Sequence, residues 1–265
     1  MFAPDKLKLL IPTSSMRITL LLFIIFFIPS TSIATNLNQY SKIQGLSPLV
    51  DTPATKLVGI TYNAQLKQYI TLHNGNNLSN VLDENFNFIK QINNNANGND
   101  HEDLLYIGKT ANNQHEYAVV DEYGRLFLGA FTPDTGFNYK QFQTITYSAG
   151  PQLKNYGGEG LAYNAASDTF YVCVEGRYHT DPDKFSPMKI YQFARPATQA
   201  DISYLDSGLT VTELFDAELK LRPYIADISS CYFNNQTQSL IILSQISEKV
   251  IEVDLSNFSI SLCKT

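Results

Sequence analysis

The sequence has 265 residues, of which 44% are hydrophobic and 17% are charged. This composition is typical of a globular domain. It excludes extended disorder, which requires low hydrophobicity and high charge, and a long coiled coil, which requires many more charged residues. The net charge of -6 argues against a nucleic-acid partner, because proteins that bind polyanions rely on basic surfaces.

Residues 1–34 are typical of a secretory signal peptide. An uncharged apolar run from Ile18 to Ile28 follows Arg17, and a small-x-small pattern ends at Ala34. The run is shorter than the about 20 apolar residues of a membrane span. We therefore predict cleavage after Ala34 and a secreted or periplasmic domain over residues 35–265. The alternative is an uncleaved segment that anchors the protein in the cell membrane through residues 18–28.

Three cysteines in a chain of this length do not form a disulfide framework. An oxidising compartment would permit one disulfide among Cys173, Cys231 and Cys263, with one thiol left over. Cys173 lies in an apolar run over residues 170–174. We interpret it as a buried thiol that packs like a small apolar side chain.

Four segments of the remaining chain repeat one pattern, in which two short apolar runs are joined by turn-forming residues. In three of them, seven positions separate the aromatic that ends the first run from the apolar start of the second; the pairs are Tyr62 and Tyr69, Tyr163 and Phe170, and Phe233 and Leu240. The remaining repeat has a longer turn between Tyr106 and Tyr117. Such a pattern predicts hairpins. Further short apolar runs follow each hairpin, at residues 87–92, 125–131, 144–146, 188–193, 212–215 and 249–255.

Each repeat therefore predicts about four strands, and no long helical periodicity appears after Ala34. A four-stranded propeller blade takes about 40–50 residues, and insertions in loops account for the longer repeats. We predict an all-β fold, a β-propeller of four-stranded blades, with about five blades of which four are detectable as repeats. The regular hairpin spacing argues against the alternative, a β-sandwich.

Several of these repeats carry motifs that resemble the SdiA-regulated family of bacterial propellers, which is related to phytase-like and lactonase-like propellers. Residues 100–108 (DHEDLLYIG) and 157–163 (GGEGLAY) resemble its blade starts, residues 119–122 (VVDE) its strand end, and residues 226–230 (ADISS) a later motif. The resemblance covers about residues 56–262. The family's last blade motif does not occur before Thr265. We therefore expect either a shortened member or a ring closed differently, with residues 36–57.

Acidic residues recur at matching positions of these repeats. Glu102 and Glu159 begin predicted inner strands, Asp227 lies beside the start of another, and Glu122 and Glu175 follow the next strands. Because inner strands face the central channel, we predict a ring of metal ligands at its mouth. Clustered carboxylates raise one another's pKa unless a cation compensates, and Ca²⁺ prefers 6–8 oxygen ligands. Related propellers hold a metal there. The alternatives are that each acid braces its own blade or takes part directly in catalysis.

Other polar residues adjoin this predicted ring, and we assign them to ligand binding. They either neighbour the acids or occupy the equivalent strand ends: His73, Asn74, His101, Asp103, Asp121 and Gln245. The alternative for each histidine is a solvated loop position. No catalytic residue is assigned, because the sequence lacks a G-x-S-x-G elbow, a P-loop and an H-E-x-x-H motif.

These observations predict an exported propeller of the bacterial envelope that binds a small molecule or an envelope protein and holds Ca²⁺ at the channel mouth. One alternative is a metal-dependent hydrolase of phosphoesters or lactones, as similar propellers are. Another is a shortened family member without function. Because one fold supports binding and catalysis alike, the fold does not choose between them.

Overall fold

The computed structural model describes residues 57–74, 77–95, 100–131, 134, 136–151 and 156–263. The chain divides into two compact units, Met1–Ile33 and Ala34–Thr265, and all described residues belong to the second. The predicted signal peptide and almost all of the predicted ring-closing segment lie outside them. Within the described part, every helix is too short or too polar to cross a membrane.

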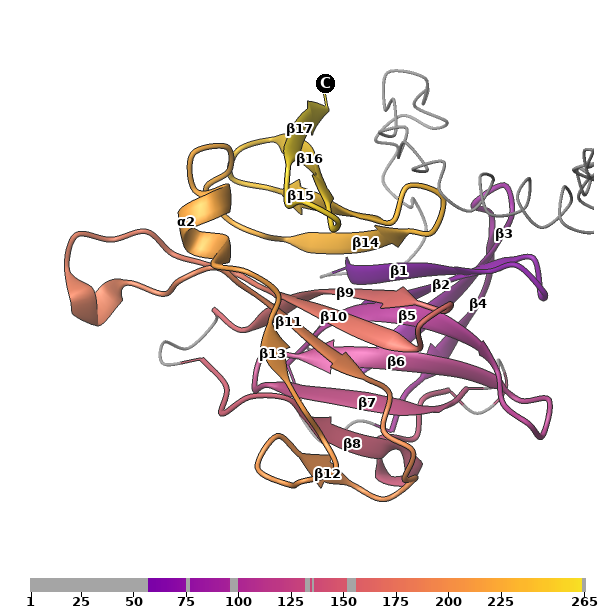
Figure 1. Ribbon diagram of the computed structural model, residues 1–265. Coiled ribbons are helices and arrows are strands. Elements are labelled where there is room, and N and C mark those ends of the chain that lie inside the picture. Colours follow the sequence, from indigo (N-terminus) through magenta and orange to yellow (C-terminus); the bar gives the residue numbers. More distant parts are fainter. Residues whose placement is uncertain are drawn as a thin grey trace, which may run out of the picture. The chain divides into compact units, whose positions relative to one another are not determined.

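Four β-sheets, one for each sequence repeat, are arranged in a ring as a β-propeller (Figure 1). We number them 1 to 4 in chain order. Sheet 1 contains β1 (Leu57–Asn63), β2 (Gln68–His73), β3 (Leu78–Asp83) and β4 (Phe88–Asn93). Sheet 2 contains β5 (His101–Lys109), β6 (His115–Asp121), β7 (Arg125–Ala130) and β8 (Gln143–Thr146), with β12 (Ile202–Ser203) parallel to β8.

Sheet 3 contains β9 (Gly158–Asn164), β10 (Thr169–Val174), β11 (Lys189–Ala194) and β13 (Thr212–Glu213), and sheet 4 contains β14 (Ser230–Asn234), β15 (Ser239–Ser244), β16 (Lys249–Asp254) and β17 (Ile260–Cys263). The hairpins predicted from the repeat spacing pair as expected, because Tyr62 faces Tyr69, Tyr163 faces Phe170 and Phe233 faces Leu240. The predicted all-β propeller of four-stranded blades is therefore confirmed, with four blades in the described residues.

The first strands of neighbouring sheets lie against one another, and glycines permit this approach. A Cβ on Gly59 of β1 would lie 2.9 Å from the amide nitrogen of Leu104 in β5. A Cβ on Gly160 of β9 would lie 2.5 Å from the amide nitrogen of Cys231 in β14. Real Cβ contacts are not so short, so any side chain at either position would push two sheets apart. Packing between sheets 3 and 4 thus explains Gly160, the third glycine of the GGEGLAY motif.

Three hydrophobic cores fill the spaces between successive sheets. Ile70 and Tyr117 belong to the core of sheets 1 and 2, Leu161 and Phe170 to that of sheets 2 and 3, and Leu240 to that of sheets 3 and 4. Each such side chain contributes about 1.5–3 kcal/mol when it is fully buried. The third core also includes the short helix α2 (Ala217–Leu221), whose first turn is capped by the side chain of Asp216.

A disulfide bond joins Cys173 of β10 to Cys231 of β14, with their Cα atoms 6.4 Å apart. The prediction of a free buried thiol at Cys173 was wrong, although the side chain is fully buried. The pairing depends on the close approach of β14 to sheet 3, which a repeat pattern along one chain does not reveal. A crosslink between positions 58 residues apart stabilises the folded state by about 4 kcal/mol in the chain-entropy model.

Candidate functional site

Four glutamates of sheets 2 and 3, the glutamate cluster, lie at the same end of the inner strands. Glu102 is in β5 and Glu159 in β9, whereas Glu122 follows β6 and Glu175 follows β10. Hairpin register brings each pair together, since the amide of Glu122 donates to the carbonyl of Asp100 at 3.0 Å and that of Glu175 to the carbonyl of Gly157 at 2.9 Å. The recurrence of glutamate at two strand ends therefore produces one site.

The electrostatics show that these four carboxyl groups share one environment. Burial is the largest cause in every case, and it raises the pKa of Glu102 to about 8, that of Glu159 to about 10 and that of Glu175 to about 7. Repulsion within the cluster adds to this, because Glu102, Glu175 and Glu122 each raise the pKa of Glu159. The pKa of Glu122 is also raised, chiefly by burial. Several of these groups therefore hold protons near neutral pH.

A hydrogen bond links Glu122 with Glu159. It raises the pKa of Glu159 and lowers that of Glu122, so the Glu159 carboxyl donates and the Glu122 carboxylate accepts. This arrangement is the usual solution for two acids in close contact, in which one proton is shared because both groups cannot ionise. Any cation that binds here has to displace that proton.

Sheet 1 contributes an amide to the same place. The Asn74 side chain donates to a carboxylate oxygen of Asp100 at 2.5 Å and to one of Glu102 at 3.0 Å. Asn74 was predicted as a ligand-binding residue, whereas Asp100 was not assigned a role. The D-x-E spacing of the DHEDLLYIG motif was the signal for Asp100. Burial is the largest cause of the raised pKa of Glu102, and the charge of Asp100 is the second.

Asp103 lies at the meeting point of all four inner strands. Its side chain accepts from the amides of Leu104 at 2.7 Å and Leu161 at 2.9 Å, and it is hydrogen-bonded to the side chain of Ser230. Its Oδ1 also lies 3.0 Å from the position of a Cβ on Gly59. The structure thus places this predicted ligand-binding residue where it ties sheets 2, 3 and 4 together.

Asp121 and Asp227 accept hydrogen bonds within their own sheets. Asp121 accepts from the amides of Tyr123 and Arg125 and forms an ion pair with the Arg125 guanidinium at 2.6 Å. Asp227 accepts from the hydroxyls of Ser229 and Ser244 and from the amide of Ile246. Asp227 still raises the pKa of Glu175. These contacts match the alternative in which an acid braces its own blade.

The remaining predicted ligand-binding residues lie apart from the glutamate cluster in their described contacts. His101 is 4% exposed and stacks on Tyr139, with ring centroids 4.2 Å apart. Burial lowers its pKa to about 4, so it is neutral. His73 is also buried, and its Nε2 bonds the hydroxyl of Thr71 and the amide of Asn80. Gln245 is exposed at a turn of sheet 4, where its amide donates to Ser229.

The donor set of the glutamate cluster fits a hard cation such as Ca²⁺, because all of its groups are oxygens. The arrangement is not a preformed metal site. Among the described residues, no group of three Asp, Glu, His or Cys side chains could hold a metal ion as placed. A cation would require the hydrogen bond between Glu122 and Glu159 to open and their shared proton to leave.

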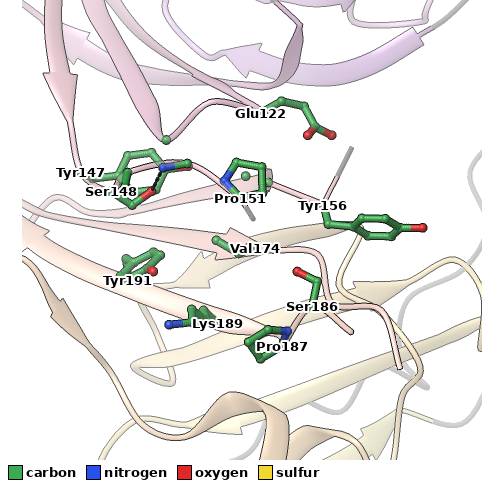
Figure 2. A pocket seen from close by; sticks show the side chains of 15 residues that line it. Glu122, Tyr147, Ser148, Pro151, Tyr156, Val174, Ser186, Pro187, Lys189 and Tyr191 are labelled. Atoms are coloured by element: carbon green, nitrogen blue, oxygen red, sulfur yellow. Dashed lines mark hydrogen bonds between the residues drawn. The ribbon is translucent and has the colours of Figure 1, made fainter. Parts of the chain in front are cut away.

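A cavity of about 280 Å³ lies between sheets 2 and 3 and shares Glu122 with the cluster (Figure 2). Sequence reasoning missed it, since its walls come from loops of two repeats. The glycines at positions 124, 150, 157 and 158 were a signal of tight turns at this place, without indicating a cavity. The side chains that matter for its chemistry are Tyr147, Ser148, Pro151, Tyr156, Ser186, Pro187, Lys189 and Tyr191.

Comparison with protein families agrees with the motifs and the blades. The model of the SdiA-regulated family matches residues 37–264. The chain belongs to the SdiA-regulated family. This SdiA-regulated protein matches no curated protein.

Solved structures resemble the fold at low sequence identity. A nidogen/laminin complex chain has a TM-score of 0.49 and 8% identity, with 79% of this chain and 65% of that chain covered. A putative 6-phosphogluconolactonase from Bacteroides uniformis ATCC 8492 has a TM-score of 0.43 and 11% identity, with 78% and 53% covered. A luciferin-regenerating enzyme has a TM-score of 0.45 and 8% identity, with 80% and 76% covered. The chain thus spans less than two thirds of the first two.

Proposed function

We propose that this SdiA-regulated protein is an exported binding propeller of the bacterial envelope whose glutamate cluster takes up Ca²⁺. The observation that carries the proposal is the gathering of four carboxyl groups from two sheets, where burial and then repulsion by the other three raise the pKa of Glu159 to about 10. A cation would replace the protons that these groups hold without it. The partner that we propose is a small molecule or another envelope protein.

Calcium suits the cluster better than a transition metal does. The nearby donors are carboxylates and the Asn74 side chain, and Ca²⁺ accepts 6–8 such oxygens in flexible geometry. Sulfur and imidazole, which softer metals prefer, are lacking, because the two described histidines nearest in sequence lie in packed cores. The affinity should increase with pH, since Ca²⁺ competes with protons for the same oxygens.

Two features support export. The signal-like segment over residues 1–34 predicts it from the sequence. The Cys173–Cys231 disulfide suits an oxidising compartment, because such bonds are rare where thiols are kept reduced. The retained alternative, an anchor formed by residues 18–28, would place the same domain at the membrane surface in the same compartment.

A hydrolase acting on phosphoesters or lactones is the second candidate. One observation favours it: the pKa of Glu175, about 7, is the value that suits a general acid or base near neutral pH. The cavity beside Glu122 would place a substrate next to the cluster. Hydrolysis of model phosphoesters or lactones that is lost with a chelator and in Glu159→Gln would favour this candidate over a binding protein.

The test is a thermal melt of the full-length protein with Ca²⁺ and with a chelator. A ligand that binds only the folded state stabilises it by about 2.7 kcal/mol at a concentration 100 times Kd, so the melting temperature should rise by several degrees. The rise should disappear in Glu102→Gln and Glu159→Gln. Glu248→Gln, at an exposed turn of sheet 4, is the matched control and should keep the rise.

Each other outcome has a defined meaning. A cooperative melt that Ca²⁺ does not shift would contradict the calcium site and make the glutamates structural. The absence of a cooperative melt in either buffer would favour the remaining alternative, a shortened family member without function.

A further inference from the structure

The cavity between sheets 2 and 3 has a size and a lining that calcium binding does not explain. Ligand pockets for drug-sized molecules measure about 300–1,000 Å³, and this one measures about 280 Å³. It therefore suits one small ring with its substituents, and it is too small for a nucleotide or a folded peptide segment. Figure 2 shows its walls approaching from loops of both sheets.

Much of the wall is formed by flat apolar groups. Pro151 and Tyr156 come from the loop that connects the two sheets. Tyr191 lies in β11 of sheet 3, and Pro187 lies just before that strand. Proline rings and tyrosine faces provide apolar contact area with little conformational freedom to lose. Such surfaces suit the C–H faces of a saturated ring.

Hydroxyl groups supply the polar part of the wall. Ser148 accepts from the amide of Gly150 at 3.2 Å, so its own O–H is available to donate. Ser186 adds a second hydroxyl. Tyr147 lies in the wall with 1% of its surface exposed, and its hydroxyl packs beside Gly158. The two serines therefore supply the hydroxyls that a ligand could reach.

The charges around the cavity disfavour an anion. The Lys189 ammonium is paired with Glu213 at 2.5 Å and lies 5.7 Å from the centre of the Tyr191 ring. An anion would thus find this positive charge already neutralised, and it would also meet the carboxyl group of Glu122.

We propose that this cavity binds a neutral sugar ring of monosaccharide size. Its C–H faces would pack against Pro151 and Pro187, and its hydroxyls would bond the hydroxyls of Ser148 and Ser186. The proposal does not depend on calcium, because none of these residues belongs to the glutamate cluster.

The test is a calorimetric titration of the full-length protein with glucose, galactose and N-acetylglucosamine, in chelator so that calcium plays no part. Glucuronate, an anion with the same ring, is the comparison ligand. We expect saturable binding of at least one neutral sugar, with glucuronate about tenfold weaker, the factor that corresponds to one lost favourable contact. No saturable binding of any neutral sugar, or tighter binding of glucuronate, overturns the proposal.

Variants of the cavity wall test the proposed contacts. Ser148→Ala removes a hydroxyl of the wall and should weaken binding roughly three- to tenfold. Ser186→Leu fills the cavity and should abolish binding. Tyr139→Phe removes a buried hydroxyl in the core of sheets 1 and 2, which has no hydrogen-bond partner among the described residues, and should leave binding unchanged. Wild-type affinity in Ser148→Ala or in a folded Ser186→Leu overturns the proposal.

Discussion

Two groups of acids at the inner strands of this propeller have opposite surroundings; the aspartates are buried, and the glutamates other than Glu122 are half-buried. Asp103, Asp121 and Asp227 are met by amides, hydroxyls or a guanidinium that donate to them. The glutamate cluster is met largely by other carboxyl groups, and Glu159 donates a hydrogen bond to Glu122. The comparison teaches that burial alone does not identify a functional acid. What distinguishes the two groups is whether the fold supplies donors.

The largest effect expected from this comparison is the loss of Asp103. Asp103→Ala would leave the amides of Leu104 and Leu161 without their acceptor where the inner strands meet, and the free energy of unfolding should fall by about 3 kcal/mol. Urea unfolding measures it. Asp134→Ala, at an exposed ion pair with Lys90, should cost less than about 0.5 kcal/mol. Equal losses of unfolding free energy in the two variants would show that the hydrogen bonds of Asp103 stabilise the fold no more than a surface ion pair does.

The second effect is a decline of stability with rising pH in the protein without calcium. The folded pKa values of Glu175, Glu102 and Glu159, about 7, 8 and 10, exceed the ordinary value of 4.5. Their contribution is therefore fully present below pH 4.5 and is lost as the pH rises through each folded pKa. Above neutral pH the slope should be on the order of 1 kcal/mol per pH unit.

Urea unfolding between pH 7 and 9.5, roughly, measures this slope above the range in which histidines titrate. Calcium should stabilise the protein more as the pH rises, because fewer protons compete with it. Burial also raises the pKa of Asp103, to about 7, and that of Asp121, in spite of their donors, so these two aspartates add to the decline. A stability that increases over this range in chelator would show that donors compensate the glutamates.

The smallest effect is that of removing one titratable group from the cluster. Without calcium, Glu159→Gln should raise the free energy of unfolding by about 1 kcal/mol above neutral pH, because glutamine is neutral without the proton that Glu159, with a folded pKa of about 10, has to take up on folding. The matched change Asp103→Asn should lower it, since an amide places a donor where two backbone amides need an acceptor. Chemical unfolding at one alkaline pH compares the two variants, and a loss in both would make Glu159 a brace.

The sequence predicted the parts of this molecule that depend on neighbours along the chain. Hairpins follow from alternating apolar runs and turn residues, so the pairing of Tyr62 with Tyr69 could be read directly. The approach of Glu102, Glu122, Glu159 and Glu175 follows from the same register, because each strand end lies beside the start of its hairpin partner.

The parts that depend on packing between blades could not be predicted. Nothing in a repeat tells whether Asp103 will meet amides of the next blade, or whether His101 will stack on Tyr139 in a core. The disulfide partner of Cys173 and the cavity wall at Tyr147 likewise come from other repeats. The difference between aspartate and glutamate distinguishes the two groups of acids. The shorter side chains of Asp103, Asp121 and Asp227 accept from nearby backbone amides.

The two-residue strand β12 has a consequence for self-association. It belongs by sequence to the connection between β11 and β13 of sheet 3, yet it pairs with β8, beside which it lies in Figure 1. An outermost strand with free amides and carbonyls is a template for strands of other molecules, and proteins that expose one are prone to aggregate. By covering β8, a segment that resembles a mere loop insertion protects sheet 2 from recruiting a second copy of the chain.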